Sequence, residues 1–331
     1  MRSRRSSTQQ GAALVTVLMI VAAMSAIGVA LTQSVTSATQ RARALDGQSQ
    51  LRFYAVSAEE AVKSRLGAMI SQVEGRLTAD MPGLNEAQIL PVDGGLVSFI
   101  VRDASNCFDL NAMVRNDDGL GLGADPDEVE AYVRLLQAIE FDRSEATALA
   151  ASLVDWMDDN QSPGQGGAED SYYLGLRPSY RTSSQTLEAV DELRAIRDYE
   201  AEILVQLRDL VCTRPHGAVV SNSVLNINTL TKAQAPLLID VLSGAIEVED
   251  AVQLIASRPL GGWPDLDEFL AEPVITAISP EFIKRDRVDT VSRYMEVSAE
   301  LTYRTQMMRI QLLFEVRSGR PITTLRRERV G

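Results

Sequence analysis

The stretch AALVTVLMIVAAMSAIGVAL, residues 12–31, decides how the rest of this sequence can fold. At a helical rise of about 1.5 Å per residue it spans about 30 Å, the thickness of the hydrocarbon core of a bilayer. It lies inside a longer segment, residues 6–40, that has no charged side chain. Because the stretch is apolar on all sides, it predicts a transmembrane helix, assigned to residues 12–33, and not the amphipathic helix of a soluble core.

The charges around this helix predict its orientation. Arg2, Arg4 and Arg5 precede it, whereas the sequence as a whole has a net charge of −13. Under the positive-inside rule, the N-terminus lies in the cytoplasm and the bulk of this single-pass chain lies across the membrane. An acidic surface repels phosphate backbones, so no nucleic acid is expected as a partner.

A glycine stands directly before the apolar helix, in QQGAAL at residues 9–14. A secretory signal peptide would have a shorter apolar core and a cleavage site after it. A short basic leader that ends in glycine before an unbroken hydrophobic helix instead resembles the type IV prepilin signal. This resemblance implies that a prepilin peptidase removes residues 1–11 by cutting between Gly11 and Ala12. It also implies that the new N-terminus is methylated and that the helix stays as the anchor.

The fifth residue after this cut is Thr16. Most proteins of the family have Glu there, which is thought to meet the N-terminal amine of a neighbour. A carboxylate inside a bilayer costs about 2.5–3.5 kcal/mol and needs a partner, so Thr16 avoids that cost and gives up that pairing. Within the family, the missing Glu resembles the K-type subunit.

The residues after the anchor predict an α+β fold. Residues 34–106 should continue the helix as an amphipathic stem and form a first strand over 96–103. The stem's apolar positions are Leu45, Leu51, Val56, Ala61, Leu66 and Ile70. Three more strands are expected over 294–302, 307–317 and 321–329, within residues 290–331. The helix would then pack on one antiparallel sheet, a type IV pilin-like arrangement.

Residues 107–289 are expected to form an all-α domain inserted between the strands. Apolar spacing predicts helices over 128–139, 144–157, 233–242, 249–257 and 265–270, and one helix or a helix pair over 186–210. Two segments, NINT at 226–229 and ASRPLGGW at 256–263, resemble a helix-hairpin-helix or SAM-like bundle. Such hairpins can bind DNA phosphates, so a membrane-tethered DNA receptor of the uptake type is the alternative function. Only Lys232 and Arg258 offer positive charge there, which favours a packing unit.

Several motifs, in order along the chain, resemble the K-type minor pseudopilin of bacterial type II secretion. They are CFDLN at 107–111, DWMD at 155–158, GAED at 167–170, LR at 193–194 and LNINT at 225–229. The resemblance implies an inner-membrane protein, with its bulk in the periplasm, that initiates and caps the pseudopilus tip during export of folded proteins. The implied partners are the I-, J- and H-type minor pseudopilins, the prepilin peptidase, the inner-membrane secretion platform and exoprotein substrates.

The segment DWMDDNQSPGQGGAED, residues 155–170, is a candidate calcium loop. Oxygen ligands on flexible backbone suit Ca²⁺, and an EF-hand-like register counted from Asp158 puts Asn160 third, Ser162 fifth and Glu169 twelfth. The sixth position is Pro163 instead of Gly, and a solvated acidic loop remains open from the residues alone. The resemblance implies calcium, and the expected ligands are Asp155, Asp158, Asp159, Asn160, Glu169 and Asp170. A second acidic loop, with Asp117, Asp118, Asp125 and Asp127, favours a solvated structure.

The remaining reactive side chains are few. Cys107 and Cys212 are the only cysteines, and on the oxidising side of a membrane they are a candidate disulfide. The sequence has no Gly-x-Ser-x-Gly, Walker or His-Glu-x-x-His motif, and its one histidine, His216, stands between Pro215 and Gly217. No enzymatic activity is therefore predicted.

Overall fold

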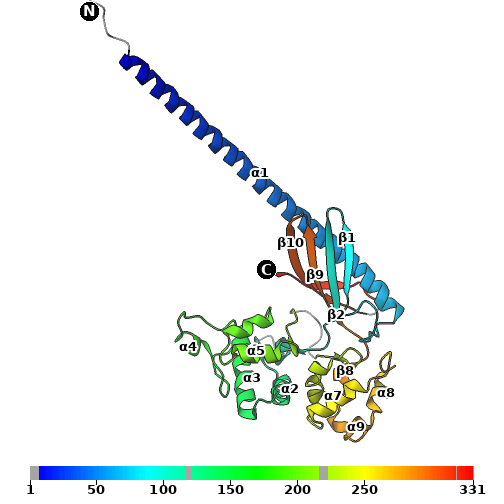
Figure 1. Ribbon diagram of the computed structural model, residues 1–331. Helices are drawn as coiled ribbons and strands as arrows, with labels where there is room; N and C mark the ends of the chain where they lie inside the picture. The colour runs from blue at the N-terminus through cyan, green and yellow to red at the C-terminus, as the bar shows by residue number, and fades with distance from the viewer. Residues whose placement is uncertain (1–6, 117–120, 216–222, 318, 331) are drawn as a thin grey trace, which may run out of the picture.

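The computed structural model describes residues 7–116, 121–215, 223–317 and 319–330. Its first element, α1 (Ser7–Gln72), is 66 residues long, and about half of it projects away from everything else (Figure 1). Six residues named above lie outside the described residues: Arg2, Arg4, Arg5, Asp117, Asp118 and His216.

The projecting half of α1 has no protein cover. Every residue from 13 to 46 is exposed, and the most apolar 18-residue window has a mean hydropathy of 2.6 with 0% of it buried. By length and composition this helix could cross a membrane. Large apolar side chains this exposed need a non-aqueous environment or a partner, in keeping with the span expected over 12–33.

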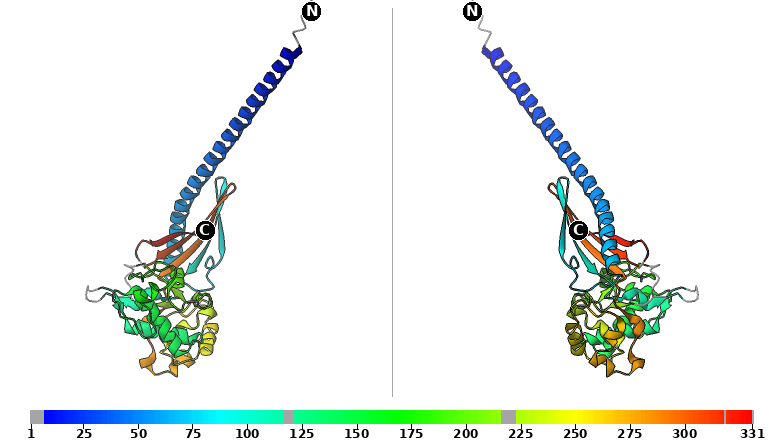
Figure 2. Two further views of the ribbon diagram at one scale, coloured as in Figure 1. Left: turned by 90° about the vertical axis from the view of Figure 1, so that its left-hand side faces the viewer. Right: turned by 90° about the vertical axis from the view of Figure 1, so that its right-hand side faces the viewer.

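The second half of α1 lies against a five-stranded antiparallel sheet (Figure 2). The strands are β1 (Ala87–Val92), β2 (Gly95–Asp103), β9 (Tyr294–Tyr303), β10 (Gln306–Glu315) and β11 (Thr323–Val330), in the order β1-β2-β9-β10-β11. All four predicted strands are present. Strand β1 was not predicted from the sequence; it is an edge strand and contains Pro91, a residue tolerated in such a strand.

The face of α1 that meets the sheet differs from the predicted one. The buried positions are Leu51, Tyr54, Ala58, Val62, Leu66 and Ile70, spaced by three or four residues. Leu45 and Val56 are 65% and 52% exposed, and Ala61 is exposed too. At about 100° per residue, Leu45 and Val56 point more than 90° away from Leu51, so these two predicted positions do not belong to the buried stripe, and the exposed Ala61 does not belong to it either.

The chain between β2 and β9 forms a second hydrophobic core at the end of the sheet far from the N-terminus (Figure 1). Its α-helices are α2 (Pro126–Ala138), α3 (Arg143–Met157), α4 (Asp170–Tyr173), α5 (Ala201–Leu207), α6 (Leu237–Val241), α7 (Val248–Ala256), α8 (Leu266–Leu270) and α9 (Pro273–Thr276). Residues 186–210 are not one long helix: a 3-10 helix, Val190–Ala195, precedes α5. Asp198 between them has φ 67°, which a continuous helix cannot contain.

Short strands and 3-10 turns complete this region, so it is not purely α-helical. The strand pairs are β3 (Phe108–Asp109) with β6 (Val211–Cys212), β4 (Val114–Arg115) with β5 (Gly123–Ala124), and β7 (Leu225–Asn226) with β8 (Val288–Asp289). The other 3-10 helices are Leu110–Met113, Lys232–Gln234, Pro280–Phe282 and Arg285–Arg287. The parallel pairs β3–β6 and β7–β8 join the start and the end of two halves, residues 108–212 and 225–289. Each half is thereby closed on itself.

The buried stripe of α1 predicts a large difference between two identical substitutions. Leu66→Ala removes a side chain that is 2% exposed in the helix–sheet core, and we expect a loss of about 2–5 kcal/mol of local stability. Leu45→Ala, in the same helix but exposed, should change it by less than about 0.5 kcal/mol. Hydrogen exchange of β2 and β9 amides in the detergent-solubilised chain measures both. Equal protection in the two variants would contradict the observed helix face.

Candidate functional site

The acidic loop turns back onto the helix that precedes it. Asp155 lies in the last turn of α3, Asp158 is its C-cap residue, and Glu169 stands directly before α4. These three side chains are buried, at 3%, 3% and 2% exposure. Burying a carboxylate is costly unless it is paired, so three together in one loop require a compensating interaction.

The hydrogen bonds of these carboxylates leave several oxygens without a partner. Asp155 accepts from the Gly164 amide at 3.1 Å, and Asp158 Oδ2 accepts from Asn160 Nδ2 at 2.5 Å. Asp158 Oδ1 and both carboxylate oxygens of Glu169 are buried with no hydrogen-bond partner among the described residues. The fold also makes room for Asp155, because a Cβ on Gly167 would lie 2.0 Å from its Oδ2.

The charge of this cluster is not balanced by nearby cations. No Lys or Arg in the described parts of the chain pairs with Asp155, Asp158 or Glu169. Burial, followed by the charge of Asp155, raises the pKa of Asp158 to about 6 and that of Glu169 to about 7. Burial also raises the pKa of Asp155. The three carboxyl groups therefore lie close enough to repel one another when ionised.

The other predicted ligands point elsewhere. Asp159 Oδ2 accepts from the Leu122 amide at 2.7 Å, and Asp170 pairs with Arg181 at 2.5 Å. Asn160 bonds only within the loop, through Asp158 and the Ser162 amide. Three of the six expected side chains, those of Asp155, Asp158 and Glu169, are thus brought together, and Asp155 lies outside the EF-hand-like register. Across the described residues, no group of three or more His, Cys, Asp or Glu side chains is already arranged to hold a metal ion.

Two residues beside this cluster were not anticipated from the sequence. Ser152 Oγ and Trp156 Nε1 are buried without a hydrogen-bond partner in the described structure. They lie one turn apart on α3, and Trp156 packs edge-on against Tyr173, with ring centroids 5.2 Å apart. The sequence signal that could have placed Ser152 and Trp156 together is their i, i+4 spacing, which puts both on one face of a helix.

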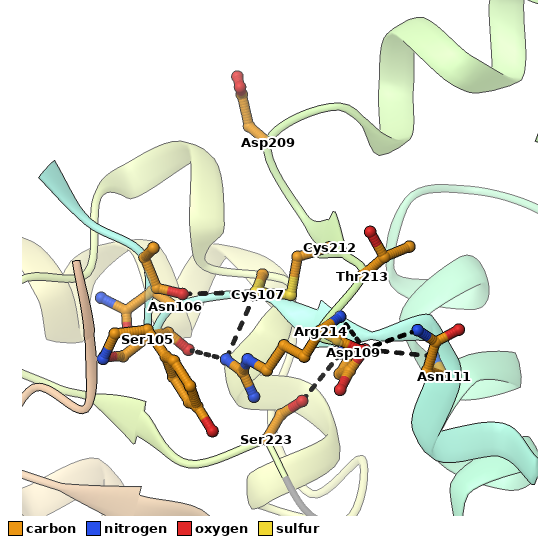
Figure 3. Close-up of a disulfide and its surroundings, with 12 residues drawn as sticks. Ser105, Asn106, Cys107, Asp109, Asn111, Asp209, Cys212, Thr213, Arg214 and Ser223 are labelled. Atoms are coloured by element: carbon orange, nitrogen blue, oxygen red, sulfur yellow. Dashed lines mark hydrogen bonds between the residues drawn. A yellow bond between two sulfur atoms is a disulfide. The ribbon is translucent and has the colours of Figure 1, made fainter. Parts of the chain in front are cut away.

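The two cysteines form a disulfide beside the paired strands β3 and β6 (Figure 3). The Cys107 and Cys212 Cα atoms are 5.7 Å apart. Arg214, which the sequence analysis did not single out, donates from Nη2 to the Ser105 carbonyl at 3.1 Å and to Cys107 Sγ at 3.6 Å (Figure 3). Its guanidinium lies 4.1 Å from the Tyr294 ring centre, and burial lowers its pKa. The disulfide joins the two ends of the first half of the helical region, and Arg214 connects that half to Tyr294 at the start of β9.

The helix-hairpin-helix-like segment is used for internal packing. Arg258 donates to the carbonyls of Ile227 and Leu230, at 3.2 and 2.9 Å, so its guanidinium is occupied by backbone. Asn228 is 1% exposed and holds the Trp263 backbone through both its amide nitrogen and its oxygen. Of the two basic residues available for phosphate, one is therefore committed to the fold.

These features define a class: a protein built on one long apolar N-terminal helix, with a sheet on its second half and a disulfide-closed helical region beyond the sheet. Comparison with known proteins specifies it further. Two family models described as type II secretion system protein K match residues 106–216 and 225–288. Their boundary falls between the two halves closed by β3–β6 and β7–β8.

Individual relatives agree with the family models. The chain is 32% identical over 272 residues to type II secretion system protein K of Pectobacterium carotovorum subsp. carotovorum, covering 81% of this chain and 79% of that protein. It is also 32% identical to the Aeromonas hydrophila protein, covering 78% of each. The chain belongs to the type II secretion system protein K family, and the resemblance seen in its motifs is confirmed.

A solved structure gives the same answer. The chain matches a subunit in the crystal structure of the GspK–GspI–GspJ complex from the type 2 secretion system of enterotoxigenic Escherichia coli, with a TM-score of 0.74 and 25% identity. The match covers 88% of this chain and 99% of that one. The family is a structural component of a secretion system, and the DNA-receptor alternative is not favoured.

Proposed function

We propose that this minor pseudopilin initiates and caps the periplasmic pseudopilus that supports export of folded proteins across the outer membrane. The observation that carries the proposal is the match, over 88% of the chain, to a subunit of a complex with GspI and GspJ. In this proposal the fold is pilin-like, and the helical region of residues 107–289 is an insertion into the sheet. The chain sits in the inner membrane with its N-terminus in the cytoplasm.

The stem helix offers a surface for sibling subunits of the I, J and H types. Leu45, Phe53 and Val56 are more than half exposed on the part of α1 that follows the apolar anchor. Leu45 and Val56 point away from the stripe that packs on the sheet. Apolar side chains on a helix face are the usual material of helix–helix packing, which supports side-by-side association of stems.

Two features support a place at the tip. Thr16 replaces the Glu that other members of the family use toward a neighbour's N-terminal amine, so this subunit needs no predecessor above it. The helical region adds bulk at the end of the sheet far from the anchor, where a subunit stacked above would clash (Figure 2). Processing by the prepilin peptidase, docking to the inner-membrane platform and contact with exoproteins complete the proposed cycle.

We expect tip placement to depend on both features. Thr16→Glu should disturb initiation or allow incorporation along the shaft, because it restores the missing attraction. Gold labelling of isolated filaments that carry wild-type or variant protein measures this, with Thr36→Glu in the same helix as the matched control. Wild-type label along the whole filament would contradict the proposal.

Processing makes a separate prediction. The mature chain should begin at Ala12 with a methylated amine, as mass spectrometry of membrane-extracted protein can determine. Gly11→Val should block the cut, because a branched side chain hinders close approach to the backbone. Gly28→Val, at a helix glycine with no atom within 4 Å of an added Cβ, should be cut normally. Wild-type protein that still begins at Met1 would contradict the hypothesis that a prepilin peptidase processes this chain.

We also propose that Asp155, Asp158 and Glu169 hold Ca²⁺. The support is chemical: these are oxygen donors, three of their oxygens are buried without a hydrogen-bond partner in the described structure, and no described cation neutralises them. A bound divalent cation would supply the missing positive charge. Metal binding would then stabilise the first half of the helical region.

Removal of calcium should lower the stability of that half. At free Ca²⁺ about 100 times the dissociation constant, the linkage is about 2.7 kcal/mol. Glu169→Gln should abolish most of this difference and, in chelator, should melt above the wild type because one repulsive charge is gone. Asp209→Asn, at an exposed site, is the control of equal charge change. Melting curves that do not respond to Ca²⁺ would contradict calcium binding by these carboxylates.

A further inference from the structure

A hollow of about 320 Å³ lies between α1 and the turn that joins β9 to β10. This turn is at the end of the sheet that faces the projecting half of α1 (Figure 1). The lining side chains are Gln40, Arg43 and Ala44, with Gly47, from α1, and Tyr303, Arg304, Thr305 and Gln306 from the turn. The helical region does not contribute to it.

Positive charge collects at this hollow although the chain is acidic. Arg43 lines it and forms no ion pair among the described residues. Arg304 approaches Asp46 at 3.8 Å, but these side chains are 63% and 66% exposed. An exposed pair at that distance contributes little, so the arginines remain available to an anion.

The turn carries an arginine where backbone conformation disfavours one. Gln306 pairs with Tyr303, so the connection has two residues, Arg304 and Thr305. Arg304 has φ 53°, a region in which such turns prefer Asn, Asp or Gly. Its guanidinium lies 4.9 Å from the Tyr303 ring centre. A residue kept in an unfavourable conformation indicates that its side chain is used.

The hollow also contains an unused hydrogen-bond acceptor. Gln306 Nε2 donates to the Ala44 carbonyl at 3.1 Å, whereas Gln306 Oε1 is buried with no partner in the described structure. The helix makes room for this side chain, because a Cβ on Gly47 would lie 2.6 Å from it. A ligand that fits must therefore bring a donor as well as negative charge.

The position of the hollow indicates where such a ligand comes from. The uncharged part of α1 ends at Gln40, so Arg41 and Arg43 are the first charges after the apolar anchor. From residue 33, the predicted end of the span, to Arg43 is about 15 Å along the helix. Side chains of α1 lean toward its N-terminus, and a long arginine reaches back toward the headgroup layer.

We propose that this hollow binds the headgroup of an anionic phospholipid. Arg43 and Arg304 hold the phosphate, and Gln306 Oε1 accepts a hydrogen bond from a headgroup hydroxyl. Phosphatidylglycerol offers both groups, whereas phosphatidylcholine has a phosphate but no donor. The inference rests on the proposed function, since it needs α1 in a membrane with the sheet beside the bilayer. A bound lipid would fix the sheet relative to the membrane surface.

The test uses the full chain in nanodiscs that contain equal amounts of phosphatidylglycerol and phosphatidylcholine. After extraction with detergent, native mass spectrometry counts the lipids that remain bound to the protein. We expect selective retention of phosphatidylglycerol, reduced about fivefold by Arg43→Gln and by Arg304→Asn. Arg304→Asn should not lower the melting temperature, because asparagine accepts a positive φ, and this separates the site from the fold. Arg320→Gln, an exposed arginine beyond β10, is the control and should leave retention unchanged.

Several outcomes would overturn the inference. They are equal retention of both lipids, unchanged retention in both variants, an equal loss in Arg320→Gln, or displacement of the lipid by millimolar inorganic phosphate, which would mean an adventitious anion only. Protease protection of the same nanodiscs separates the two hypotheses. A chain that fails to span the bilayer overturns the proposed function as well, whereas an inserted chain without lipid preference overturns only this site.

Discussion

The packing of one stripe of α1 on the sheet is the contact on which the rest of the structure depends. The first half of α1 has no protein cover, whereas its second half packs on the sheet. This contact brings Leu51, Val62 and Leu66 of α1 into one core with Val97 and Val297 of the sheet. The sheet itself pairs β2 with β9, which are far apart in the sequence. That pairing brings residues 103 and 294 close together, so everything between them must begin and end at the same place.

The helical region satisfies this constraint because the two ends of each of its halves are joined by a pair of short parallel strands. Strands β3 and β6, with the disulfide beside them, close the first half, and β7 with β8 close the second. The halves are joined by a buried ion pair, since Arg287 Nη1 donates to Glu128 Oε2 at 3.1 Å. Removing one member of such a pair costs about 3–5 kcal/mol, because the other charge remains buried. The two halves thus share one hydrophobic core.

The fold also places negative and positive charge in different parts of the molecule. The buried carboxylates of Asp155, Asp158 and Glu169 lie in the region beyond the sheet, and the arginine-lined hollow lies where the sheet turns toward the anchor. The first place gathers three carboxylates, and the second is lined by Arg43 and Arg304, with Asp46 3.8 Å from Arg304. The proposed cation at the first place and the proposed anionic headgroup at the second each follow from this division of charge.

The sequence by itself determined the long apolar N-terminal helix, the mixed helix-and-sheet class, four of the five sheet strands, the cysteine pair and the family. These follow from local signals: an uninterrupted apolar run, two-residue alternation in strands, and short motifs in a fixed order. Tertiary structure alone decided which apolar residues of α1 meet the sheet, because Leu45 and Leu66 look alike in sequence and differ only in direction. It also decided which three acids of the loop converge, and it placed Arg304 beside Arg43. Residues about 260 positions apart become neighbours only because α1 packs on the sheet, and no local pattern records that contact.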